Sequence, residues 1–256
     1  MSFFKVIIFA CSLFLTCQAV SCDFPEGEAY PSINLEDIAI VFDLSPIEDG
    51  PENANGVKQI GIDINLFDCK NRSKKLIGQL PFLADTGKVK AAFFADTAKN
   101  SEKRFFVIHS VEVRSDTGER DSGEYYTVQV YKSSGAEYRL DDKLSSYFGY
   151  GTDILDKDYK QIVYTFPYKT ERSIISRLGS KEFINWNSGV PQRLKINKKT
   201  YIYNSPVISD VTKMYLVVGD EVKQQAVEAG WVSMIYTSAK GKKISGWVLC
   251  ADADGC

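Results

Sequence analysis

The chain has 256 residues, of which 44% are hydrophobic, 12% aromatic and 25% charged. These values are typical of globular proteins and exclude a disordered or fibrous chain. The formal net charge of -2 at pH 7 provides no overall positive field for binding nucleic acid. Because His109 is the one histidine of the sequence, a zinc site with two or three imidazole ligands is excluded. We therefore expect a binding protein without a metal or other cofactor, and not an enzyme.

Residues 1–21 have the pattern of a secretory signal peptide. Lys5 precedes an apolar run at 6–15, and small residues follow it. The run is shorter than the roughly 20 apolar residues that a membrane span needs. We expect a cleaved signal peptide, export to the periplasm of a Gram-negative bacterium and no transmembrane segment. Cleavage directly before Cys22 would resemble lipoprotein processing, which is the alternative fate of this terminus.

Four cysteines follow the signal peptide, namely Cys22, Cys69, Cys250 and Cys256. An even number of cysteines in an oxidising compartment favours disulfides. A bridge between Cys250 and Cys256 would hold the C-terminal tail, and one between Cys22 and Cys69 would hold the mature N-terminus. The alternative is a lipidated Cys22 with a buried free thiol at Cys69.

The distribution of charge suggests two domains of opposite sign. Residues 22–192 carry 21 basic and 27 acidic side chains, whereas residues 193–256 carry 9 basic and 6 acidic ones. The polar segment 187–191 contains Gly and Pro, which mark a turn or linker. We predict a boundary there, between an acidic domain at 22–190 and a small domain at 191–256.

The acidic domain has the pattern of a β-rich fold with a few short helices. At 60–66, Ile and Leu alternate with Gly, Asp and Asn, which predicts a strand with one wet face. Turn residues at 116–118 and 121–123 predict the tip of a long hairpin. Asp141 is the expected cap of a helix ending at Gly149, and Thr170 that of a helix ending at Gly179. The further predicted strands are 37–42, 89–94, 105–113 and 125–131.

The small domain is predicted to contain five short strands. Such strands within some sixty residues are typical of a small β-barrel, so the fold class is mainly β. Tight turns separate the strands, and we expect Gly219 and Gly230 to adopt positive φ there. The predicted strands are 195–203, 214–218, 221–227, 231–236 and 244–248.

Four segments of this domain share an order found in a known family. They are Tyr-Ile-Tyr-Asn-Ser-Pro at 201–206, a Leu-Val-Val-Gly-Asp turn within 214–222, Gly-Trp-Val at 230–232 and Gly-Trp-Val at 246–248. This order resembles the bacterial SH3-like (SH3b) domain over about a quarter of the chain. The resemblance implies a small barrel. In exported bacterial proteins, such domains commonly bind peptidoglycan or protein segments.

The small domain also carries the candidate binding residues. Aromatic side chains on an SH3-like barrel can line a groove and stack on peptide or sugar faces. The alternative for each of them is packing in the core, which we expect for Tyr215 and Trp247. A basic turn could meet an acidic partner, although such a turn is usually only solvated. The candidates are Tyr201, Tyr203, Trp231 and Tyr236, with Lys240 and Lys242 in the basic turn.

One enzymatic alternative uses Asp68, Cys69 and His109. Their order is similar to that of bacterial cell-wall cysteine peptidases, which often carry SH3-like modules. Those enzymes follow the cysteine with Ser-Gly, whereas Lys70 and Asn71 stand here. A reactive thiolate also needs a helix N-terminus or a cation beside it. We predict no catalytic residue, a disulfide at Cys69 and a hydrogen-bonded sheet position for His109.

The sequence therefore favours an exported, non-enzymatic periplasmic protein that binds a protein or cell-wall ligand through an SH3-like module. One specific member of this class is an immunity protein that inhibits an antibacterial toxin, because an acidic surface speeds the capture of a basic partner. The alternative of a different class is a module that anchors the chain to peptidoglycan.

Overall fold

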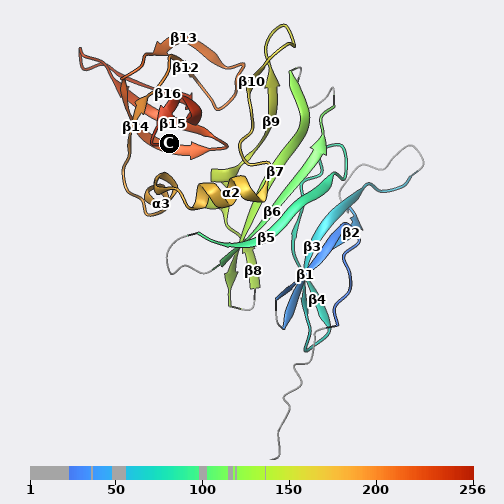
Figure 1. The fold of residues 1–256 in the computed structure, drawn as a ribbon. Helices are drawn as coiled ribbons and strands as arrows, with labels where there is room; N and C mark the ends of the chain where they lie inside the picture. Colours follow the sequence, from blue (N-terminus) through green and yellow to red (C-terminus); the bar gives the residue numbers. More distant parts are fainter. Residues whose placement is uncertain are drawn as a thin grey trace, which may run out of the picture.

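The computed structural model describes residues 23–35, 37–47, 56–97, 103–114, 118, 120–135 and 137–256. Within this part of the chain the fold is mainly β, as predicted, with three antiparallel sheets and three short helices (Figure 1). The predicted signal peptide at 1–21 and Cys22 lie outside the described residues. None of the helices in the described ranges is long and apolar enough to cross a membrane.

The N-terminal sheet and the central sheet are built from consecutive hairpins. The N-terminal sheet has the strand order β1-β2-β3-β4, and the central sheet has the order β10-β9-β7-β6-β5 with β8 paired to β7. The strands of the N-terminal sheet are β1 (Tyr30–Leu35), β2 (Ile38–Pro46), β3 (Ile60–Asp68) and β4 (Ser73–Gln79). Those of the central sheet are β5 (Lys88–Asp96), β6 (Lys103–Glu112), β7 (Asp121–Ser134), β8 (Glu137–Leu140), β9 (Tyr150–Leu155) and β10 (Ile162–Tyr164).

The central sheet is covered on both faces, and the sequence of its strand β6 is correspondingly apolar on both faces. Phe105 and Val107 point into a core shared with the N-terminal sheet, where they meet Phe42 of β2. Phe106 and Ile108 point into a second core on the opposite face. Successive side chains of a strand point to opposite faces, so a strand buried on both sides reads as a continuous apolar run.

Helices α1 (Asp142–Phe148), α2 (Glu171–Leu178) and α3 (Lys181–Asn187) cover the second face of the central sheet. The first two were predicted with their caps. Asp141 accepts a hydrogen bond from the backbone N of Leu144, and Thr170 accepts one from the backbone N of Ser173. Helix α3 was not predicted, although Ser180 caps it in the same way.

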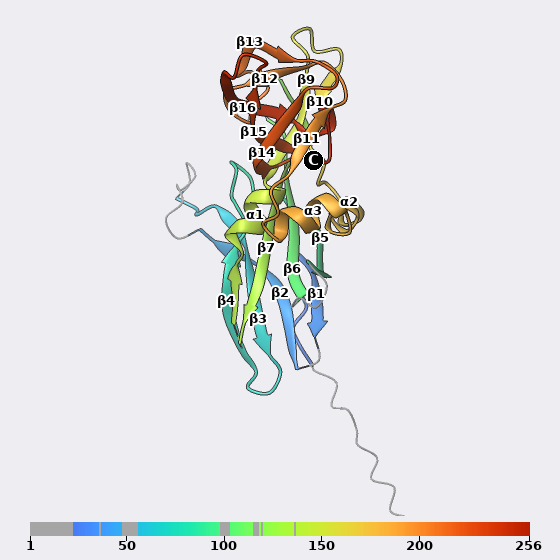
Figure 2. The same ribbon diagram turned by 90° about the vertical axis from the view of Figure 1, so that its left-hand side faces the viewer.

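The C-terminal sheet curls into a half-barrel of seven strands in the order β13-β12-β16-β15-β14-β11-β17. It lies at the opposite end of the molecule from the N-terminal sheet, with the three helices between them (Figure 2). Its turns fall where the sequence predicted them, and Gly219 and Gly230 have φ of 94° and 82°. The strands are β11 (Arg193–Ile196), β12 (Thr200–Tyr203), β13 (Val211–Leu216), β14 (Glu221–Glu228), β15 (Trp231–Thr237), β16 (Lys243–Leu249) and β17 (Ala253–Asp254).

Two sequence predictions of local structure were wrong. The single strand expected at 195–203 is divided, because β11 pairs with β14 and β17 whereas β12 pairs with β13 and β16. The predicted long hairpin is present, since β6 pairs with β7, but 121–123 do not belong to its tip. They are the first residues of β7, where Gly123 has positive φ and its carbonyl accepts a hydrogen bond from the Val113 N–H.

A disulfide joins Cys250 and Cys256, whose Cα atoms are 5.2 Å apart, as predicted. Cys69 is also disulfide-bonded, and Cys22, its expected partner, lies outside the described residues. The predicted boundary at residue 190 coincides with the connection from α3 to β11. One apolar core nevertheless extends from the helices into the C-terminal sheet, so the division into two independent domains stays a prediction.

Candidate functional site

Two of the predicted binding residues, Tyr203 and Trp231, meet below the surface of the C-terminal sheet. The indole of Trp231 is 3% exposed and packs edge-on against the ring of Tyr203, with 5.0 Å between ring centroids. On its other side it stacks on Tyr164 of β10, at 5.6 Å. Trp231 is therefore a core residue that also connects the C-terminal sheet to the central sheet.

Tyr201 lies on the outer face of β12. The strand alternates, so Thr200 and Ile202 are buried while Tyr201 points outward. Its neighbour across the strand pair is Tyr215, whose ring is 6.5 Å away and which is 52% exposed. The expectation that Tyr215 lies in the core was therefore wrong.

The ammonium of Lys199 lies 4.3 Å from the centroid of the Tyr215 ring and 5.9 Å from that of Tyr201. This geometry allows a cation–π interaction that covers part of both rings. β13 is the end strand of its sheet and exposes further apolar side chains. We call this set the barrel-edge patch, and it consists of Tyr201, Val211, Met214, Tyr215, Val217 and Val218.

The remaining predicted residues lie outside the barrel-edge patch. The hydroxyl of Tyr236 donates a hydrogen bond to Asp220 at 3.3 Å, and the charge of Asp220 raises the pKa of this phenol. Lys240 and Lys242 are exposed in the turn between β15 and β16. The six predicted residues thus do not form one site: Tyr203 and Trp231 meet in the core, Lys240 and Lys242 share a turn, and Tyr201 and Tyr236 lie elsewhere, so their binding roles stay predictions.

Ala229 is one of the points at which the C-terminal sheet is attached to the rest of the molecule. Its backbone N donates to the carbonyl of Tyr147 at 3.0 Å, and its carbonyl accepts from the hydroxyl of Tyr164 at 2.6 Å. Both polar groups of this buried residue are therefore satisfied by the other half of the chain.

Beside this attachment lies a cavity of about 190 Å³, which we call the junction pocket. The pocket is lined by residues of β7, β9 and β10 of the central sheet, by β14, β15 and the turn between them, and by the loop at 206–208. The chain segments that meet here are far apart in sequence, since the lining residues run from Asp121 to Trp231. The acidic and aromatic side chains that line it are Asp121, Tyr125, Tyr150, Tyr164, Glu228 and Trp231.

Two tyrosines form the outer wall of the junction pocket. The rings of Tyr125 and Tyr150 are stacked at 6.0 Å with 26° between their planes. Tyr150 is 58% exposed, which places it at the mouth, whereas Tyr125 is half-buried. Burial raises the pKa of the Tyr125 phenol to about 12, with Tyr150 and Asp121 adding to the shift, so the Tyr125 ring is neutral at physiological pH.

Asp121 and Glu228 provide the charge of the junction pocket. Both are half-buried, and neither makes a side-chain hydrogen bond or an ion pair with another described residue. Burial raises the pKa of Asp121. No lysine or arginine of the described ranges lines the pocket, although Arg120 lines an adjoining hollow that shares Asp121, Ile154, Val207 and Ile208 with it.

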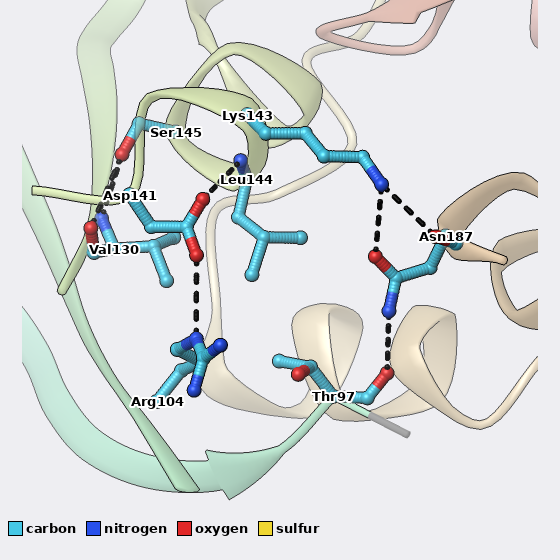
Figure 3. Close-up of polar contacts among 8 residues, drawn as sticks. All are labelled: Thr97, Arg104, Val130, Asp141, Lys143, Leu144, Ser145 and Asn187. Atoms are coloured by element: carbon cyan, nitrogen blue, oxygen red, sulfur yellow. Dashed lines mark hydrogen bonds and ion pairs between the residues drawn. The ribbon is translucent and has the colours of Figure 1, made fainter. Parts of the chain in front are cut away.

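A network of hydrogen bonds and an ion pair holds α1, the helix that ends just before Tyr150 (Figure 3). Asp141 caps α1 and also accepts from the Nε of Arg104 at 3.3 Å, in a largely buried ion pair. Lys143 donates to the backbone carbonyl and the side chain of Asn187 in α3. Because Tyr150 follows α1 after a single residue, these contacts set its position at the pocket mouth.

A second cavity, of about 520 Å³, lies between α2 and the C-terminal disulfide. Its cations are already engaged: Arg177 donates to the Tyr147 hydroxyl and to the Cys256 carbonyl, both at 2.6 Å. Lys198 pairs with Asp252 at 2.7 Å. The two cations that line this cavity are therefore already held by contacts within the chain.

The residues of the enzymatic alternative lie on different sheets. Cys69 follows β3 of the N-terminal sheet and is disulfide-bonded, so its sulfur is not a thiolate. His109 is 1% exposed on β6 of the central sheet, with its Nε2 2.9 Å from the carbonyl of Thr86. Burial lowers the pKa of His109, which favours the neutral ring.

No protein-family model, no curated protein and no solved structure matches this chain. The geometry of its own residues therefore carries the functional argument.

Proposed function

We propose that the chain is an exported, non-enzymatic binding protein that captures a protein partner in the periplasm, with its C-terminal sheet serving as an SH3-like module. The observation that carries the proposal is the barrel-edge patch, in which six apolar or aromatic side chains are at least 42% exposed on adjacent segments. Soluble proteins usually expose such side chains singly, and a cluster of them marks an interaction surface.

The details of the patch favour protein over glycan. A sugar ring needs an open aromatic face, whereas Lys199 lies over the Tyr215 ring. Val211, Met214 and Val218 are flexible or aliphatic side chains of the kind that pack against another protein. Addition of a partner strand is disfavoured, because the register of β13 is irregular and the Met214 N–H is bonded to Thr212 Oγ1.

Disulfides support export, since they persist in oxidising compartments. A partner that must be inhibited quickly, such as an antibacterial toxin, fits a surface that is already folded, because preorganisation lowers the ordering cost of binding. An immunity protein is accordingly the specific member of the class that we propose.

Co-sedimentation with purified bacterial sacculi tests the proposal against the peptidoglycan-anchoring alternative. We expect the mature protein to stay in the supernatant and to release no muropeptides. Pelleting that is lost in Tyr201→Ala but kept in Tyr236→Phe would contradict protein capture and support wall anchoring. Release of muropeptides that depends on Cys69 would contradict the non-enzymatic assignment.

A further inference from the structure

We infer that the junction pocket accepts an arginine side chain of the protein partner, with its guanidinium at Asp121 and Glu228 and its flat face and stem against the Tyr125–Tyr150 wall. This inference rests on the proposed function in so far as the arginine belongs to a protein. The pocket and the barrel-edge patch contain different residues, so each can be tested separately.

The volume of the junction pocket suits one amino-acid side chain and not a larger ligand. A volume of about 190 Å³ corresponds to roughly six water molecules at about 30 Å³ each. Sites for drug-sized ligands and cofactors are larger, typically about 300–1,000 Å³. A long unbranched side chain that enters from the mouth at Tyr150 fits the smaller volume.

The charges of the pocket select a cation. Other acidic groups of the central sheet have partners within the chain: Asp153 is bonded by Lys169 at 2.5 and 2.6 Å, and Glu124 is bonded by Lys88 and Lys90. Asp121 and Glu228 have no such partner among the described residues. A half-buried carboxylate without a partner is costly, and an incoming cation removes that cost.

The aromatic wall selects a planar cation. A guanidinium stacks on tyrosine faces and presents a fork of N–H donors that suits two carboxylates, whereas an ammonium is a compact and strongly hydrated charge. Trp231 and the half-exposed Val207 also line the pocket and supply apolar surface for the methylene stem.

A titration of the whole mature protein with N-acetyl-arginine amide tests this inference, followed by backbone amide NMR shifts. We expect saturable shifts at Tyr150, Gly151 and Glu228. The neutral isostere N-acetyl-citrulline amide should produce shifts at least tenfold weaker at equal concentration. Comparable shifts with the two probes would overturn the inference. So would the absence of shifts with both probes up to about 50 mM, a ceiling for weak sites.

Matched variants locate the site. Asp121→Asn and Tyr150→Ala should each weaken binding of the arginine probe at least fivefold, whereas Asp158→Asn, with the same charge change at an exposed turn, should leave it unchanged. Retained binding in Asp121→Asn would overturn the assignment. Since the titration contains no partner protein, its failure is distinguishable from a failure of the proposed function, which depends on the barrel-edge patch.

Discussion

The hydroxyl of Tyr164 in β10 donates a 2.6 Å hydrogen bond to the carbonyl of Ala229, in the turn between β14 and β15. This contact joins residues that are 65 positions apart and attaches the C-terminal sheet to the central sheet. Because both groups are buried, removal of the hydroxyl leaves the carbonyl without a partner.

Tyr164→Phe should therefore destabilise the folded protein by about 1–2 kcal/mol, since a buried acceptor loses its donor while the ring packing is kept. Urea unfolding followed by tryptophan fluorescence measures this change. Tyr201→Phe is the matched control, because its ring is exposed and its hydroxyl makes no hydrogen bond to a described residue. An equal effect of the two substitutions would contradict the role of the Tyr164–Ala229 contact.

The continuous core predicts how the whole chain unfolds. Tyr147, Phe148 and Phe183 of the helices share one apolar cluster with Val232 and Met234 of the C-terminal sheet. We expect one cooperative transition, with fluorescence and far-UV circular dichroism giving the same midpoint. Two separate transitions would instead support the two independent domains predicted from the charge pattern.

Asp141 combines a helix cap with an ion pair, and two substitutions separate these roles. Asp141→Asn keeps a capping oxygen at α1 but loses the charge that faces Arg104, and should cost about 1–2 kcal/mol. Asp141→Ala removes both and should cost about 2–4 kcal/mol. Thermal or urea denaturation measures the difference, and equal costs would contradict a separate contribution from the cap.

Glu124 should make the free energy of unfolding depend on pH under acidic conditions. Burial alone would raise its pKa, but hydrogen bonds from Lys88, Lys90 and Tyr126 lower it from 4.5 to about 2. A lowered folded-state pKa stabilises the protein above the unfolded value, and this contribution is lost as the pH falls from about 4.5 to about 2. Glu124→Gln should flatten the stability profile in that window, as measured by urea midpoints at each pH.

Glu112→Gln is the control for this profile. Glu112 lies directly opposite Glu124 on β6, is exposed, and accepts no hydrogen bond from a described lysine. Its substitution should leave the acid dependence in place. A profile that is unchanged by Glu124→Gln, or flattened equally by Glu112→Gln, would contradict the assignment.

The local structure of this chain could be predicted where short-range chemistry determines it. The alternation at 60–66 identified β3, and the caps at Asp141 and Thr170 identified α1 and α2. β4 was missed because its side chains are mostly polar and exposed. α3 was not predicted, although it has seven residues like α1 and Ser180 provides the same capping signal as Asp141.

The candidate site could be predicted only in part, because it depends on contacts between distant segments. Tyr201 belongs to the barrel-edge patch, but Tyr215 was assigned to the core because an aromatic residue in a strand is more often buried. Asp121, Tyr150 and Glu228 carried no signal in sequence. They form a pocket only because the C-terminal sheet docks on β9 and β10, which no local pattern encodes.

Site-specific photo-crosslinking in the producing cell tests protein capture most directly. A photoreactive phenylalanine analogue replaces Tyr215 in the barrel-edge patch, and the control carries it at the exposed Asp158. We predict a discrete protein adduct at position 215 that is absent at position 158. Adducts at position 215 that contain only muropeptides, or the same adducts at both positions, would contradict capture of a protein partner through this patch.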